Sequence, residues 1–338
     1  MANIMITQRC NLSCPYCFAN EFTNTNTEDM TIDNFKKALD FIKTDPLERV
    51  GIIGGEPTLH PDFARMLEII INDDSIKRAI IYTNGVFINR YIKHLTNNKF
   101  TLLINCNPPA AIGYDTYNRL IANLKQMINE YYMKNKITLG FNMYLPFPEY
   151  RFIIDILKMF DFDHLRTSIV VPNDRSANVF EYFGRIKPRV KELFGILSEN
   201  NIFPFFDCNA LMPCMMTDEE KMAIKDFMKK AQIRENKDYA ICKPIVDILP
   251  NLEAIRCFGL SEFEKVRIAD FHKIKDLKNY FMNSFDSYAF NVSTAKKCND
   301  CYKRKTMRCS GGCLIFKMNK INDLKSLARQ ETQAINIS

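Results

Sequence analysis

The feature that most constrains the fold is a repeated alternation, over the first 200 or so residues, of short β-branched runs with amphipathic helical patterns. We predict strands at residues 4–7, 50–53, 79–82, 101–105, 137–141 and 167–171. Repeated strand–helix units form parallel sheets, because each helix returns the chain to the starting edge of the sheet. About six such units predict an α/β fold, a partial (β/α)6 TIM barrel whose functional residues follow the carboxyl ends of the strands.

The helical segments support this assignment. In the first of them, Thr31 can cap a helix whose Phe35, Leu39 and Ile42 share one face. The pattern changes after about residue 200, where residues 203–214 read as a turn-rich link. Residues 217–231 then predict a helix opened by a capping box. Beyond residue 240 we expect short irregular segments, and residues 331–338 form a polar tail. We therefore expect a barrel domain at 1–200 and a cysteine-rich domain, with its bridging helix, at 201–338.

Composition narrows the class of protein. The net charge is +7 over 338 residues, and the lysines and arginines are interspersed with acidic residues. This distribution favours a solvated surface over a nucleic-acid-binding one. The sequence shows neither a signal peptide nor a run of about 18 apolar residues, so we expect a cytoplasmic protein without a membrane span. In that reducing compartment the twelve cysteines predict metal ligands, not disulfides. The four histidines include no pair at i, i+4, which disfavours a histidine-based zinc site.

The first cysteine motif follows the first predicted strand. In RCNLSCPYCF, Cys10, Cys14 and Cys17 are separated by three and then two residues. Three thiolates on one loop can hold three irons of a [4Fe–4S] cluster and leave the fourth iron open to an exogenous molecule. A zinc site that borrows a distant fourth ligand is the alternative.

A second motif, Gly54-Gly55-Glu56-Pro57, ends the second predicted strand. Small residues let a backbone approach a ligand, and a carboxylate can accept hydrogen bonds from an ammonium group. A glycine pair alone more often marks a turn, so this motif gains meaning only beside the first one.

Together, the CxxxCxxC loop and the GGEP motif resemble the radical S-adenosylmethionine superfamily. The resemblance implies that S-adenosylmethionine chelates the open iron, that the GGEP motif holds its amino group, and that Tyr16 lies beside its adenine. The stretches PTLHPDF and YTNG, the latter containing Asn84, extend the resemblance. Further candidate contacts to the ribose and carboxylate are Asn105, Asn142 and Arg119. Alternatively, the two asparagines satisfy turns and Arg119 is an exposed helix charge.

The last cysteines form a third motif. In CNDCYKRKTMRCSGGC, four cysteines have gaps of two, seven and three: Cys298, Cys301, Cys309 and Cys313. The motif resembles the SPASM auxiliary-cluster domain of peptide-modifying radical enzymes, although its middle gap is longer by two. Cys242 and Cys257 bracket a segment similar to the hairpin of that domain. The SPASM pattern has a further downstream cysteine, and this chain has none after Cys313.

The number of remaining cysteines suggests which residues could replace the missing downstream cysteine. Eight remain outside the first loop when Cys106, which we expect to be a buried small hydrophobe, is set aside. Eight thiolates suffice for two auxiliary [4Fe–4S] clusters, and Cys208 and Cys214 could supply the missing ligands. One auxiliary cluster with some free cysteines, or a structural zinc, are the alternatives.

The resemblance implies an enzyme that reductively cleaves S-adenosylmethionine and abstracts hydrogen from a substrate. The SPASM-like half favours a ribosomally made peptide as substrate, modified by crosslinking, thioether formation or epimerisation. Because the chain begins at the first strand, we expect a separate leader-recognition protein or a direct peptide groove, and an electron donor such as flavodoxin or ferredoxin. The alternatives are a small-molecule dehydrogenase or cofactor-biosynthesis enzyme and, from another class, a cysteine-rich zinc protein that binds nucleic acid or a partner.

Overall fold

The computed structural model describes residues 1–24, 27–46, 49–172, 178–206, 208–209, 211–222, 241–287 and 291–318. Most of the helix predicted at 217–231 and the polar tail at 331–338 lie outside these ranges. The capping box of that helix is present, because Glu220 N donates to Thr217 Oγ1 at 3.2 Å and Thr217 N donates to Glu220 Oε2 at 2.8 Å. Among the helices described, none is long and apolar enough to cross a membrane.

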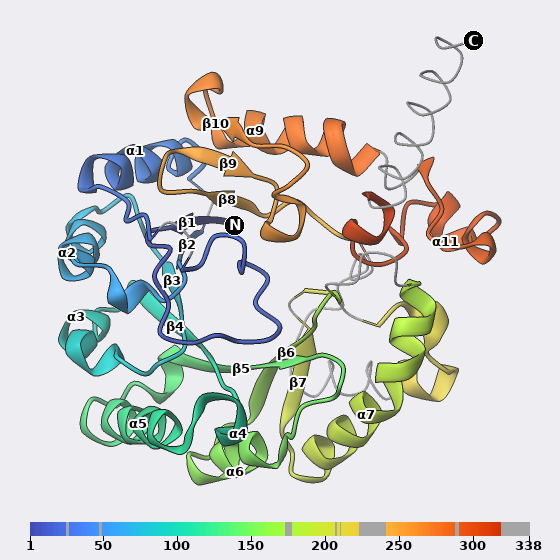
Figure 1. The fold of residues 1–338 in the computed structure, drawn as a ribbon, viewed down its shortest axis with the longest axis horizontal. Coiled ribbons are helices and arrows are strands. Elements are labelled where there is room, and N and C mark those ends of the chain that lie inside the picture. Colours follow the sequence, from blue (N-terminus) through green and yellow to red (C-terminus); the bar gives the residue numbers. More distant parts are fainter. Residues whose placement is uncertain are drawn as a thin grey trace, which may run out of the picture.

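One ten-stranded sheet organises the molecule (Figure 1). Seven consecutive strands pair in parallel: β1 (Ala2–Met5), β2 (Val50–Ile53), β3 (Ala79–Thr83), β4 (Phe100–Asn105), β5 (Ile137–Met143), β6 (His164–Ile169) and β7 (Phe203–Phe206). On the other side of β1, β8 (Val246–Ile248) adds a further parallel strand and continues antiparallel into β9 (Glu253–Ile255) and β10 (Val266–Arg267). Among the described residues, β7 and β10 end the strand order and do not pair with each other, so the barrel is open there.

Helices surround the parallel strands on the outside (Figure 1). They are α1 (Ile32–Ile42), α2 (Phe63–Asn72), α3 (Ile92–Leu95), α4 (Pro109–Ile112), α5 (Tyr114–Lys125), α6 (Arg151–Met159) and α7 (Val179–Glu199). The C-terminal part adds α9 (Ile274–Phe281) and α11 (Tyr302–Lys305). The apolar core lies between sheet and helices, where Ile4 and Ile52 share one cluster with Phe35 of α1 and Phe63 of α2. Burying each such side chain stabilises the fold by about 1.5–3 kcal/mol.

The predicted cap of α1 is confirmed, because the Thr31 side chain accepts a hydrogen bond from Asn34 N. All six predicted strands are present. The prediction of a turn-rich link over 203–206 is wrong: Phe203–Phe206 form β7, which pairs with β6. Its sequence, FPFF, has no alternation, and the Pro204 it contains is tolerated because β7 is an edge strand.

The expectation of irregular segments beyond residue 240 is wrong in part, since this region holds three strands and α9. The hairpin anticipated between Cys242 and Cys257 is present as β8 and β9. Its first strand extends the barrel sheet beside β1, an assignment that the local sequence does not reveal.

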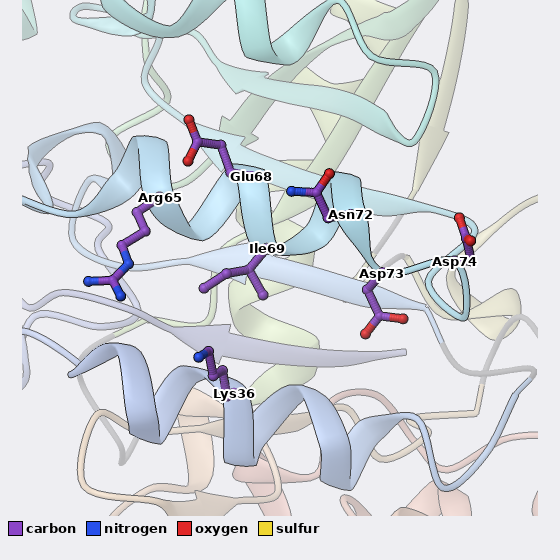
Figure 2. A pocket seen from close by; sticks show the side chains of 7 residues that line it. All are labelled: Lys36, Arg65, Glu68, Ile69, Asn72, Asp73 and Asp74. Carbon is purple, nitrogen blue, oxygen red and sulfur yellow. The ribbon is translucent and has the colours of Figure 1, made fainter.

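A surface hollow of about 590 Å³ lies on the outer face of α1 and α2 (Figure 2). Its lining comes from both helices and the segment after α2: Lys36, Arg65, Glu68, Ile69, Asn72, Asp73 and Asp74. Figure 2 shows charged groups of both signs around the opening, as on an ordinary solvated helical face. The loop of Cys10, Cys14 and Cys17 and the GGEP motif at residues 54–57 lie elsewhere, after the carboxyl ends of β1 and β2.

Candidate functional site

The loop with the first three cysteines leaves β1 and crosses the middle of the barrel (dark blue in Figure 1). Local hydrogen bonds close it: Cys17 N donates to Cys14 O at 3.0 Å, and Cys10 N donates to Asn24 Oδ1 at 2.9 Å. Cys10, Cys14 and Cys17 are all partly exposed, so each thiol is both held by the loop and accessible.

The electrostatics of this loop disfavour free thiolates. Burial raises the pKa of Cys10 to about 11, and the charges of Glu56 and of the other two thiols act in the same direction. Burial also raises the pKa of Cys14 and Cys17. A metal cluster that takes up thiolates would replace these protons and balance the charge, so the donor set fits iron–sulfur ligation.

The glycine pair brings the end of β2 against this loop. Gly55 N donates to Thr7 O at 2.8 Å, and Glu56 N donates to Arg9 O at 2.7 Å. A Cβ on Gly55 would lie 2.3 Å from Arg9 O, and one on Gly54 would lie 2.8 Å from Thr7 O. The glycines are therefore required for the close approach of two backbone segments.

Glu56, whose backbone N–H contacts the start of the same loop, is 1% exposed. Its Oε1 accepts hydrogen bonds from Thr58 Oγ1 at 2.7 Å and Thr83 Oγ1 at 2.6 Å, and its Oε2 accepts one from Asn84 N at 2.7 Å. Burial raises the pKa of this carboxyl group, whereas the donors favour its ionised form. The carboxylate is held in one orientation, and an oxygen with two acceptor sites can receive a further donor at Oε2.

Tyr16, the predicted adenine neighbour, is buried. Its hydroxyl donates to Asn107 Oδ1 at 2.6 Å, and its ring centroid lies 5.1 Å from that of Tyr144. Asn107 Nδ2 in turn donates to Cys14 Sγ at 3.7 Å. Sequence reasoning missed Asn107, although its position two residues after β4, at the catalytic end of a barrel strand, is a usable signal.

Asn84 ties the end of β3 to the cysteine loop, because its Nδ2 donates to Asn11 Oδ1 at 2.9 Å. Asn105 lies at the end of β4, and its Oδ1 is buried without a hydrogen-bond partner among the described residues. It lies over Gly140, where a Cβ would be only 2.7 Å away. A buried unpaired acceptor fits a bound donor such as a ribose hydroxyl or an amino group.

Asn142 at the end of β5 belongs to a polar group that includes β6. Its Oδ1 accepts hydrogen bonds from Arg166 Nη1 at 2.8 Å and Ser168 Oγ at 2.9 Å. Arg119, by contrast, is exposed on α5, with its guanidinium 5.4 Å from the ring centroid of Phe87. Arg166 is a second cation near the strand ends that sequence reasoning did not identify.

The eight later cysteines separate into two groups of electrostatic neighbours. The first group is Cys208, Cys242, Cys257 and Cys313, in which Cys242 and Cys313 share a hydrogen bond and the charges of Cys208 and Cys242 raise the pKa of the other two. The second group is Cys214, Cys298, Cys301 and Cys309, which line one small cavity together with Lys317. In the described part of the chain, no three His, Cys, Asp or Glu side chains are arranged as ligands of one metal ion.

Cys106 is buried at 2% exposure next to the end of β4, and burial raises its pKa to about 12. The expectation of a small buried hydrophobe agrees with this position.

The parallel barrel, with a three-cysteine loop after β1 and a carboxylate after β2, defines the class of protein. Residues 4–129 match the family model of the radical SAM superfamily. Residues 4–129 therefore form a radical SAM domain.

Among characterised relatives, the S-adenosylmethionine-dependent nucleotide dehydratase of Selenomonas ruminantium is 39% identical over 88 residues. The match covers 26% of this chain and 31% of that protein.

Two solved structures share the fold over nearly the whole chain. The structure of anSMEcpe with bound AdoMet and Cp18Cys peptide is similar with a TM-score of 0.62 at 16% identity, over 100% of this chain and 99% of that one. Streptococcus suis SuiB bound to its precursor peptide SuiA gives a TM-score of 0.62 at 16% identity, over 93% and 71% of the two chains. At this identity the likeness establishes the fold.

Proposed function

We propose that this protein reductively cleaves S-adenosylmethionine and uses the resulting 5′-deoxyadenosyl radical to abstract hydrogen from a peptide during its maturation. The observation that carries the proposal is the loop of Cys10, Cys14 and Cys17, held by backbone hydrogen bonds against Gly55 and Glu56. Three thiolates leave one iron of a [4Fe–4S] cluster for S-adenosylmethionine. When bound, the reduced cluster supplies one electron to the sulfonium.

The chain's own residues orient the nucleoside. Glu56, fixed by Thr83 and Asn84, offers Oε2 to the amino group of S-adenosylmethionine. Tyr16 presents a ring that Asn107 holds through the hydroxyl, which suits contact with adenine. The unpaired Oδ1 of Asn105 offers an acceptor to a ribose hydroxyl. These groups would position the reactive carbon of bound S-adenosylmethionine.

A carboxylate of S-adenosylmethionine needs a cation or several donors. Arg166, which lies within β6 and donates to Asn142, is better placed for this contact than the exposed Arg119. We retain Arg119 as the second candidate, because it extends from a helix that follows β4.

We further propose two auxiliary [4Fe–4S] clusters, one for each group of four later cysteines. Each group contains the four thiols that such a cluster needs, and the charges of its members interact. The clusters would accept an electron from a substrate radical or conduct electrons to the barrel. All eight of these cysteines follow residue 200, in the second of the two expected domains.

A peptide substrate is supported by the fold. The chain is matched from end to end by anSMEcpe, whose structure was solved with a bound peptide, and SuiB was solved with its precursor peptide. The second candidate is a small anionic metabolite. It is supported by the sequence likeness to the nucleotide dehydratase and by the cationic Arg166 beside the strand ends. For a peptide substrate we expect an electron donor of the flavodoxin or ferredoxin type and a separate leader-recognition protein as partners.

Anaerobic reconstitution tests the proposal. Three clusters predict about twelve irons and twelve sulfides per chain, and one auxiliary cluster predicts about eight. With a reductant and S-adenosylmethionine, the reconstituted protein should form 5′-deoxyadenosine. A protein that takes up stoichiometric zinc and remains colourless would refute the radical function. Incubation with a candidate precursor peptide or with nucleotides, followed by mass spectrometry, separates the two substrate classes.

A further inference from the structure

Arg256 is a charged side chain in the interior, 1% exposed, directly before Cys257 at the end of β9. Removing a guanidinium from water is unfavourable unless it is paired and hydrogen-bonded. The groups that contact Arg256 therefore indicate which negative charge it neutralises.

Two of these partners are cysteines of one group. Arg256 Nη1 donates to Cys242 Sγ at 3.6 Å and lies 3.9 Å from Cys257 Sγ, and Nη2 donates to Cys242 O at 3.1 Å. On its other edge, Nε donates to Asp286 Oδ1 at 2.6 Å. The guanidinium lies between two thiols and one carboxylate, and its planar donor array uses both edges.

These contacts place one fixed positive charge against two sulfur atoms, an arrangement that suits anionic sulfur. The ion pair between Arg256 and Asp286 does not by itself explain the position of Arg256, because that ion pair requires no contact between the guanidinium and a sulfur atom.

We propose that Arg256 raises the reduction potential of an iron–sulfur cluster held by Cys208, Cys242, Cys257 and Cys313. It does so by directing a fixed positive charge and an N–H donor at two of the four sulfur ligands. Reduction adds one electron to the cluster, and a nearby cation stabilises the reduced form. Asp286 opposes this effect from the far side of the guanidinium. The inference rests on the proposed function, because it requires a cluster at these four cysteines.

The opposite charges of the pair provide the test. We would titrate the anaerobically reconstituted full-length chain with reductant and follow the reduced clusters by electron paramagnetic resonance. Arg256→Gln should lower the ratio of reduced to oxidised cluster about tenfold at a fixed potential, equal to a drop of about 59 mV for a one-electron couple. Asp286→Asn should shift the same signal in the opposite direction, and Arg256→Lys should keep most of the wild-type potential.

Two controls assign the effect. Arg267→Gln removes an exposed cation from β10 and should leave every potential unchanged. Cys257→Ala should remove the signal that Arg256→Gln shifts, together with about four irons per chain.

A structural role alone predicts that Arg256→Gln and Asp286→Asn lose iron together without a shift of opposite sign. That result, or two shifts of the same sign, would overturn the proposal. If Arg256→Gln fails to hold the cluster, the Asp286→Asn variant tests the proposal, because its reduction potential should be higher than that of the wild type. A wild-type chain that binds iron at the first loop but none at these four thiols would overturn both this inference and the auxiliary clusters, while leaving the cleavage of S-adenosylmethionine intact.

Discussion

The cysteine loop after β1 and the C-terminal cysteine groups use the same side chain in opposite electrostatic surroundings. In the loop, the charged neighbours of Cys10 are Glu56 and two other thiols, all of which raise its pKa. In the C-terminal groups, the buried Arg256 and Lys317 face the sulfurs. Buried negative charge has to be balanced locally. In the loop, the positive charge that balances the thiolates has to come from the bound cluster. In the C-terminal groups, Arg256 and Lys317 supply part of that positive charge.

The two regions also differ in how they are assembled. The loop is a contiguous segment that Gly55 and Glu56 fix against the end of β2. The C-terminal groups draw on segments separated by about a hundred residues, as between Cys208 and Cys313. We expect the loop to lose cluster binding when its local structure is distorted, and the C-terminal groups to lose it when the tertiary structure is disrupted.

The largest expected effect follows from removing one ligand of the loop. Cys14→Ala should abolish formation of 5′-deoxyadenosine, because the loop then supplies two thiolates instead of three. Absorption from the auxiliary clusters should persist. Cys106→Ala, the same substitution at a buried cysteine outside the three groups, serves as the control and should retain cleavage. Unchanged 5′-deoxyadenosine from the Cys14 variant would contradict the assignment.

Removing a ligand from the second C-terminal group should separate cleavage from product formation. Cys309→Ala is expected to lose about four irons per chain and the modified substrate, while 5′-deoxyadenosine is still formed. Quantitation of both products in one reaction measures this. If cleavage is lost as well, the auxiliary region is either an entry route for electrons or required for folding, and thermal unfolding of the variant distinguishes these two causes.

A smaller effect concerns the support of the loop. In Gly55→Ala the new methyl group would lie 2.3 Å from Arg9 O, so the loop has to move away from β2. We expect a loss of about 1–3 kcal/mol in the free energy of unfolding and impaired iron uptake at the first site. Gly195→Ala on α7 is the matched control, since nothing lies within 4 Å of its Cβ position. That helix substitution should stabilise the protein by about 0.5–1 kcal/mol. Equal unfolding free energies for the two variants would show that the close approach is unimportant.

The last prediction concerns a pH dependence at the contact between the two regions, with the wild-type activity at neutral pH left unchanged. Asp247 of β8 accepts hydrogen bonds from Asn3 Nδ2 on β1 and from Phe258 N, and burial raises its pKa to about 7. Between about pH 4 and pH 7 the unfolded chain releases this proton while the folded protein retains it. Stability should therefore fall with rising pH across this window, by on the order of a few kcal/mol, and level off above it.

The Asp247→Asn variant should lose most of this slope in denaturant unfolding measured from pH 4 to pH 8. Asp74→Asn, which alters an exposed acid, should retain the wild-type slope. A slope that is the same in all three proteins would assign the pH dependence to other groups.

The sequence predicted those parts of the fold that depend on local pattern. Alternating runs located all six expected strands, and the Thr31 cap was correct because capping involves neighbouring residues. It missed β7, whose Phe203–Phe206 segment becomes a strand only by pairing with β6. Among the site residues, Asn107, Arg166 and Arg256 were not identified, since the role of a polar side chain depends on which distant groups lie beside it.

The sequence by itself determined the cysteine loop, because three ligands within eight residues need only a local turn. The sequence also showed that eight cysteines other than those of the loop and Cys106 are present as candidate ligands. Only the tertiary structure decided how they divide: Cys208 lies among the neighbours of Cys257 and Cys313, whereas Cys214, five intervening residues later, lies with Cys298 and Cys309. The physical reason is that the sheet extension by β8 and β9 and the packing of the C-terminal segments set the distances between sulfurs, and spacing along the chain does not encode those distances.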